Sequence, residues 1–83
     1  MSDTVSHGTL SAVVSPEEYR QPPERSRLFG SPGSLQWYIR TRRAELTKAG
    51  ALLVVGGRVH IHAQRFDEFV LRAGAAEAAE RCA

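Results

Sequence analysis

The segment Leu52-Leu-Val-Val-Gly-Gly-Arg-Val-His-Ile-His62 contains the strongest structural signal in the chain. Two runs rich in β-branched residues flank Gly56-Gly57, a dipeptide that accepts the positive φ angles of a two-residue hairpin turn. Polar residues alternate with apolar ones in the second run, so one face should carry Arg58, His60 and His62. The sequence therefore predicts a β-hairpin with a polar, partly cationic face.

A helix is predicted just before the hairpin, at about residues 33–48. Ser31-Pro32 or Ser34 can cap its start, and Gly50 can end it in a left-handed turn. On a 3.6-residue period, one side of this helix is apolar and the other is polar and mostly basic. The apolar side comprises Leu35, Tyr38, Ile39, Leu46 and Ala49, and the opposite side comprises Gln36, Arg40, Arg43 and Thr47.

Shorter helices are predicted on either side of this pair. One begins at Ser15-Pro16-Glu17-Glu18, which has the spacing of a capping box, and stops before Pro22-Pro23. Residues 24–30 could form a further turn that buries Leu28 and Phe29. A closing helix is predicted over residues 63–72. Its inward residues should be Phe66, Phe69 and Val70, and its solvent-facing acids should be Asp67 and Glu68.

Composition divides the chain into three parts. Residues 1–14 form a leader rich in Ser, Thr and Gly, which we expect to be mobile or to contain a short strand around residues 10–14. Residues 15–74 form the folded domain. Gly74 marks a stop or weak point before an alanine-rich tail, residues 75–83, which could be a helical extension, an interaction element or frayed chain.

Positive charge is concentrated in the middle of the chain. Between Arg25 and Arg65 there are eight basic residues and one acid, Glu45, so this stretch has net charge +7, whereas the whole chain has +2. Most of these basic residues fall on the predicted basic helix and hairpin. A cationic helix beside a cationic hairpin is typical of small proteins that bind duplex DNA.

Size and composition argue against an enzyme. Eighty-three residues with 42% hydrophobic content supply one modest core and little room for a substrate cavity. No catalytic triad pattern, phosphate loop or metal cluster is visible, and two histidines on one strand without a nearby cysteine or carboxylate do not make a zinc site. We therefore expect no catalytic residue, no metal and no cofactor.

The chain also carries signals of its compartment. A lone cysteine, Cys82, excludes an internal disulfide, which fits a reducing environment. No run approaches the roughly 18 apolar residues of a membrane span, and residues 1–14 lack the basic start and apolar centre of a secretory signal. We expect a cytoplasmic protein that does not enter a membrane.

The order of helix, basic helix, glycine-turned hairpin and final helix resembles the excisionases, also called recombination directionality factors, and more distantly the MerR-like regulators. The resemblance covers residues 15–72. It rests on Leu35-Gln-Trp-Tyr-Ile-Arg40, on the segment from Ala49 to His62, and on Arg65-Phe-Asp-Glu-Phe69. These look like the family's leucine-tryptophan recognition helix, Gly-Ala turn, Gly-Arg wing and phenylalanine-anchored last helix. The Pro-rich segment 21–33 departs from the family's first helix and tight turn.

The resemblance implies an α+β, mostly α, winged helix-turn-helix with a two-stranded β-hairpin wing. It also implies a protein that binds and bends double-stranded DNA at the attachment site of a phage or an integrative and conjugative element, and directs a partner integrase, a tyrosine recombinase, toward excision. A module this small contacts few phosphates, so we expect copies to associate head to tail on DNA.

In this interpretation the basic helix enters the major groove, where arginine can bind guanine and glutamine can bind adenine through paired hydrogen bonds. The candidates for reading bases are Gln36, Arg40 and Arg43. Those for sugar, phosphate or minor-groove contacts are Trp37, Arg42, Thr47, Lys48, Arg58 and His60. The charged and polar candidates have a simpler alternative as solvated surface residues, and the alternative for Trp37 is packing in the core.

Two other functions stay open. A small winged-helix transcriptional regulator of a mobile element would bind one promoter site as a dimer. A long coiled-coil dimerisation helix would favour it, and the sequence predicts none. A protein-interaction module or antitoxin-like adaptor would meet an acidic partner with its basic face. A steep salt dependence of DNA binding would exclude the adaptor.

Overall fold

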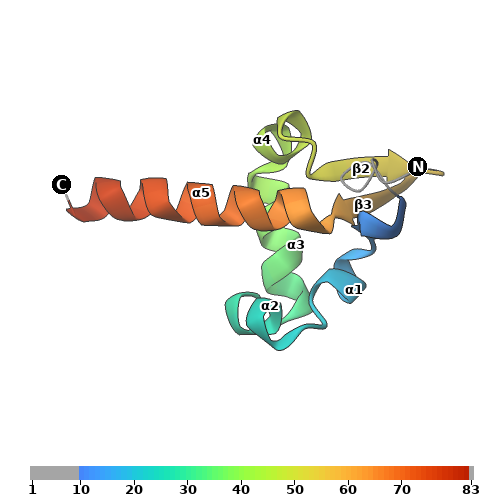
Figure 1. The fold of residues 1–83 in the computed structure, drawn as a ribbon, viewed down its shortest axis with the longest axis horizontal. Helices are drawn as coiled ribbons and strands as arrows, with labels where there is room; N and C mark the ends of the chain where they lie inside the picture. The colour runs from blue at the N-terminus through green and yellow to red at the C-terminus, as the bar shows by residue number, and fades with distance from the viewer. Residues whose placement is uncertain (1–9, 83) are drawn as a thin grey trace, which may run out of the picture.

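Nine elements of secondary structure follow one another along residues 10–82, the part of the chain that this computed structural model describes (Figure 1). In order they are a 3₁₀ helix (Leu10–Ala12), β1 (Val13–Val14), α1 (Pro16–Tyr19), α2 (Pro23–Leu28), α3 (Pro32–Thr41), α4 (Arg43–Lys48), β2 (Leu52–Val55), β3 (Arg58–His62) and α5 (Ala63–Cys82). The predicted α+β, mostly helical class is confirmed. The predicted leader lies outside the described residues up to position 9, and the expected strand near its end is β1.

The sheet is antiparallel and three-stranded, with β3 between β1 and β2. β2 and β3 form the predicted hairpin, in which Val55 lies opposite Arg58. Its turn is Gly56-Gly57, with φ angles of 61° and 81°, which residues with a β-carbon rarely adopt. The hairpin is therefore confirmed, and β1 adds a third strand that the two-stranded prediction lacked.

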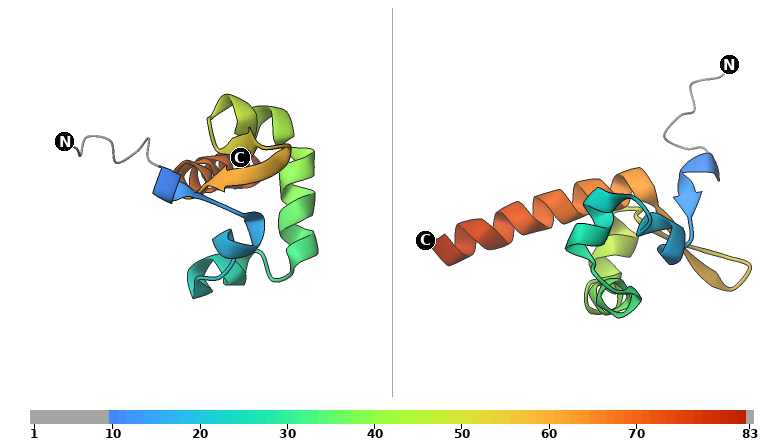
Figure 2. Two further views of the ribbon diagram at one scale, coloured as in Figure 1. Left: turned by 90° about the vertical axis from the view of Figure 1, so that its right-hand side faces the viewer. Right: turned by 90° about the horizontal axis from the view of Figure 1, so that it is seen from below.

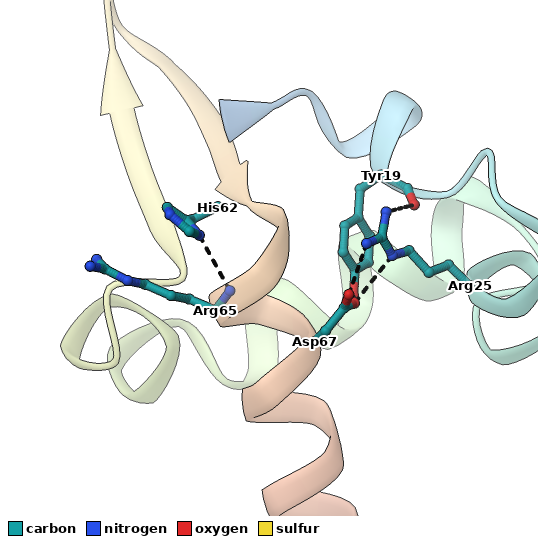
Figure 3. A network of polar contacts seen from close by, with 5 residues as sticks. All are labelled: Tyr19, Arg25, His62, Arg65 and Asp67. Carbon is teal, nitrogen blue, oxygen red and sulfur yellow. Dashed lines mark hydrogen bonds and ion pairs between the residues drawn. The ribbon is translucent and has the colours of Figure 1, made fainter. Parts of the chain in front are cut away.

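His62 alternates with Arg58 and His60 along β3 as predicted, but it is buried, so the prediction that it is exposed with them is wrong. Its side chain is 4% exposed, because β1 pairs with this end of β3 and places Val13 opposite His62. The ring Nδ1 of His62 accepts a hydrogen bond of 3.3 Å from the backbone N–H of Arg65 (Figure 3). His62 thus satisfies a backbone donor in the first turn of α5 that has no partner within the helix.

The single helix predicted at residues 33–48 is broken at Arg42, so that prediction is wrong in its middle. Arg42 has φ −120° and ψ 26°, which are not helical values, and it separates α3 from α4. The Thr41 hydroxyl lies 2.9 and 3.2 Å from the carbonyl oxygens of Trp37 and Tyr38, and such contacts bend helices. The apolar face nevertheless continues across the break. Its buried members are Leu35, Ile39 and Leu46.

Both ends of this helical segment form as predicted. Ser31 caps α3 by exchanging hydrogen bonds with Ser34, at 3.2 and 3.3 Å. After α4, Gly50 has φ 76°, its N–H binds the Thr47 carbonyl, and the next N–H binds the Leu46 carbonyl. These are the two bonds of a Schellman motif, which turns the chain sharply toward β2.

Aromatic side chains join the helices in the core. Phe66 is fully buried, and its ring centroid lies 4.8 Å from that of Tyr19 and 6.3 Å from that of Phe29. Phe66 and Phe69 pack inward as predicted, and Phe29 is buried. Leu28 was expected to be buried too, but its side chain is 65% exposed. α2 ends at Leu28, and the chain enters the core only at the next residue.

Asp67 was expected to face solvent, but it binds α1 and α2 (Figure 3). Its carboxylate accepts a hydrogen bond from the Tyr19 hydroxyl and two from the Arg25 guanidinium, at 3.1 and 2.8 Å. The Arg25 guanidinium also lies 4.4 Å from the centroid of the Tyr19 ring. The hydrogen bonds that Arg25 donates to Asp67 raise the pKa of Arg25. This network fixes the two short helices against the start of α5.

α5 continues through Gly74 to Cys82, so the alanine-rich tail is a helical extension as far as residue 82. Figure 1 shows that this helix projects beyond the other elements, and the molecule measures 46 × 26 × 26 Å. Residues 74–82 are all exposed. One ion pair, between Arg42 Nη2 and Glu77 Oε1 at 3.7 Å, links this extension to the α3–α4 junction.

Candidate nucleic-acid interface

Four of the predicted contact residues line one groove of about 330 Å³. α3 contributes Gln36 and Arg40, α4 contributes Arg43 at its first position, and β3 contributes Arg58. The break at Arg42 does not separate Arg40 from Arg43. The fold also brings Arg58 to the same groove, although it is distant from the other three in sequence.

The groove combines apolar residues with cationic ones. Pro16, Ile39 and Val59 line it together with the polar residues, and Ile39 is 4% exposed. Such a surface can contact both charged groups and apolar groups of one ligand. Deoxyribose rings and thymine methyl groups are apolar, and they lie beside phosphates in duplex DNA.

The elements that carry this groove lie away from the long helix. In the right view of Figure 2, α5 runs along one side of the molecule, whereas α3 and the tip of the hairpin lie toward the opposite side. Gln36, Arg40, Arg43 and Arg58 are all exposed. A large ligand can therefore approach α3 and the hairpin together without meeting α5.

The positive charge of the groove is uncompensated within the described chain. Among residues 10–82, the arginines that form ion pairs are Arg25, Arg42 and Arg81, and none of the three groove arginines does so. Between Glu45 and Asp67 the sequence has no acid. Three like charges on one concave surface create a positive potential that attracts a polyanion.

The remaining candidates lie outside the groove. Trp37 is 58% exposed on α3, and Thr47 and Lys48 are exposed in the last turn of α4. His60 is half-buried, and its Nδ1 lies 3.1 Å from the Arg58 carbonyl oxygen, to which it can donate. This contact holds the imidazole against the backbone of β3 and leaves Nε2 as its second polar atom.

Arg42 is placed differently from the other candidates. Its guanidinium lies 4.7 Å from the centroid of the Tyr38 ring and contacts Glu77 of α5. It lines a separate cavity of about 660 Å³ that α5 shares with the α3–α4 junction. Burial raises the pKa of the half-buried Tyr38, and the neighbouring Arg42 opposes that shift. The structure does not bring Arg42 together with the groove residues.

Two residues at the end of the hairpin were not predicted as functional candidates. Val54 and Val55 are 67% and 55% exposed, next to the glycine turn. In β2 only Leu52 is buried and Leu53 is half-buried, so the strand extends past the core. The position of two apolar residues directly before Gly56-Gly57 is the sequence signal that could have identified them.

Among residues 10–82, no helix is long and apolar enough to cross a membrane, and no three His, Cys, Asp or Glu side chains converge as metal ligands would. Comparison with protein-family models, curated proteins and solved structures finds no match to this chain.

Proposed function

We propose that this protein is a cytoplasmic, DNA-binding winged helix-turn-helix module in which α3 enters the major groove and the β2–β3 hairpin is the wing. One observation carries the proposal: Gln36, Arg40 and Arg43 share a groove with Arg58 of the hairpin. A helix and an adjacent cationic hairpin can contact neighbouring grooves of one duplex at the same time.

Each part of the groove has a distinct proposed role. Gln36, Arg40 and Arg43 read base edges, because their planar end groups can form paired hydrogen bonds with purines. Arg58 contacts the minor groove or the adjacent backbone. Lys48 binds phosphate at the end of α4, and exposed Trp37 contacts sugar or a thymine methyl. Arg42 can contact the DNA backbone only after its ion pair with Glu77 breaks.

The biological role that we propose is that of an excisionase. Copies of the protein would bind adjacent sites in an attachment region, associate head to tail and bend the DNA, so that a tyrosine recombinase carries out excision. The family resemblance of residues 15–72 supports this role, as do the groove arginines, which form no ion pair within residues 10–82. Binding at a single promoter site would instead indicate a transcriptional regulator.

The test is binding to duplexes tiled across the DNA that flanks the gene and any neighbouring integrase attachment site, with random duplex as competitor. The proposed interface has four cations, namely Arg40, Arg43, Lys48 and Arg58. If each displaces about one counterion from the duplex, the slope of log K against log salt is roughly −3 to −4. A ladder of shifted bands confined to the attachment region supports the excisionase role, and one band at a promoter supports the regulator. No salt-sensitive binding to any duplex would contradict DNA binding itself.

A matched pair of variants distinguishes binding through the groove from an effect of the protein's net charge. Arg40→Ala/Arg43→Ala removes two arginines from the groove, whereas Arg72→Ala/Arg81→Ala removes two exposed arginines from α5. Both lower the net charge equally. On a duplex with a single site, we expect the first variant to bind at least about 30-fold more weakly, at about 1–3 kcal/mol for each base-reading arginine removed. The second variant should change binding to that duplex less than about twofold. Equal weakening by the two variants would exclude the groove as the binding surface.

A further inference from the structure

We infer that the tip of the hairpin, Val54 and Val55 with Gly56-Gly57, is an apolar wedge that enters the minor groove of duplex DNA and opens it, which bends the duplex toward the major groove. This inference rests on the proposed DNA binding and adds the residues that would deform the DNA.

The tip stands free of the rest of the protein. Val54 and Val55 are 67% and 55% exposed, whereas Leu52 in the same strand is 8% exposed. A β-carbon built on Gly56 or Gly57 would meet nothing within 4 Å. The two valines therefore contribute little to the core, and their apolar surface is available to a ligand. Because valine has few rotamers, fixing these side chains in a complex costs little entropy.

The length of the tip matches the depth of the minor groove. A strand rises about 3.3 Å per residue, so Val55 lies roughly 10 Å beyond the buried Leu52 along the strand. The minor groove of B-DNA is about 7.5 Å deep. The tip can therefore reach the floor of the groove while the base of the hairpin stays in the protein.

The width of the tip does not match the groove, and this mismatch is the source of the bend. Paired strands lie about 4.8 Å apart, and the undistorted minor groove is about 6 Å wide. Val54 and Val55 project from opposite faces of the hairpin, because neighbouring residues in a strand alternate. Two backbones with a valine on each face are wider than the groove. Inserted apolar side chains open the minor groove and bend DNA away from it.

Charge favours DNA over a second copy of the protein at this site. Val55 pairs with Arg58 across the hairpin, and Arg58 lines the groove with Arg40 and Arg43. Two tips that packed against each other would bring these like charges together. A duplex instead offers phosphates to the arginines and deoxyribose rings to the valines.

The experiment compares the wild-type protein with Val54→Thr/Val55→Thr on a duplex that carries a binding site. Threonine keeps the β-branched shape and the strand preference but makes burial against apolar surface less favourable. Energy transfer between dyes at the two ends of the duplex reports the bend, and titration reports affinity and its salt slope. The control is Leu71→Gln, which removes an apolar side chain that is 73% exposed on α5.

We expect the double threonine variant to bind roughly 3- to 10-fold more weakly and to bend the duplex less. Its salt slope should match the wild type, because no cation is removed. Leu71→Gln should match the wild type in bend and affinity. Both variants change only exposed side chains, and their thermal unfolding is measured alongside.

Two results would overturn the inference while DNA binding stands. One is a double threonine variant that binds and bends the duplex as the wild type does. The other is a wild-type protein that self-associates without DNA and loses this property in the variant, because the valines would then join copies. Failure of the wild type to bind any duplex is a different result, and it would reject the proposed function itself.

Discussion

Tyr19 shows how one buried residue couples the stability of this fold to alkaline pH. Its side chain is 1% exposed, and its hydroxyl donates to Asp67. Burial, followed by that hydrogen bond, raises the pKa of Tyr19 far above its usual range. The folded protein therefore keeps the tyrosine proton at a pH at which the unfolded chain loses it.

The sign of the pH dependence follows from this shift. The raised pKa of Tyr19 adds to the free energy of unfolding. This added stability is fully present below the unfolded pKa of about 10 and is lost as the pH rises above it, at up to about 1.4 kcal/mol per pH unit. Tyr19→Phe should lower stability by about 1–2 kcal/mol at neutral pH through the missing hydrogen bond, and should flatten the alkaline decline. Urea unfolding at several pH values between about 8 and 11 measures both effects. An equally steep decline in the variant would contradict the assignment to Tyr19.

Arg40 and Arg42 are close in sequence, but the structure gives them different surroundings. Arg40 lines the groove, whereas Arg42 contacts Tyr38 and Glu77. We expect Arg40→Ala to relax the preference at one base pair, by about 1–3 kcal/mol. Arg42→Ala should weaken binding to all sequences alike and by less. Affinities for a set of single-base variants of the site measure this, and the same weakening on every sequence from both substitutions would contradict the role of Arg40.

The end of α4 depends on a glycine. Gly50 has φ 76°, and a β-carbon there would lie 2.8 Å from Nη1 of Arg65. Gly50→Ala should lower stability by about 1–2 kcal/mol, because left-handed backbone is strained for alanine and the Arg65 side chain must move. Thermal and urea unfolding measure the change.

Gly30→Ala is the matched control for this prediction. A β-carbon at Gly30 would meet nothing within 4 Å, and Gly30 is not among the glycines with positive φ. Its substitution should be neutral or stabilising by less than about 1 kcal/mol. Similar destabilisation at both positions would show that the left-handed turn after α4 is not what requires glycine.

The whole molecule consists of a packed body and a projecting helix. α5 packs against the body through Phe66 and Phe69, and Val70 and Ala73 pack at the edge of the core. Beyond them, residues 74–82 are exposed. The extension therefore contributes little to the core, and its ion pair with Arg42 is partly exposed, which limits its effect on stability to about 1 kcal/mol.

Deletion of residues 75–83 should leave the body folded, with a melting temperature within a few degrees of the full chain. Binding to a single site should strengthen slightly, because Arg42 no longer has Glu77 as its partner. Stepwise occupancy of several adjacent sites should weaken, because we propose that the extension contacts a neighbouring copy on DNA. Circular dichroism and shifted-band ladders measure these effects. If the deletion left both the oligomeric state in solution and the stepwise occupancy of adjacent sites unchanged, that role for the tail would be excluded.

Several features of the fold could be predicted because their causes lie within a few residues of each other. The hairpin follows from Gly56-Gly57 between two β-branched runs. The capping box at Ser15 joins residues three positions apart, and the end of α4 depends on Gly50 and the carbonyls just before it. The buried side of α3 and α4 follows from helical spacing. Local geometry and burial act in the same direction at these positions.

Other features depend on contacts between distant residues, which no local pattern reveals. Asp67 lies 48 residues from Tyr19 and 42 from Arg25 in sequence, so its pairing could not be predicted from its place on a helix. His62 is buried because β1 pairs beside it, and Arg42 faces α5 because the helix breaks there. The groove also depends on contacts between residues that are distant in sequence. The sequence alone specified a basic helix and a basic hairpin. It was the tertiary structure that placed Arg58 beside Arg40 and Arg43 and left Val54 and Val55 beyond the core, because both depend on long-range packing.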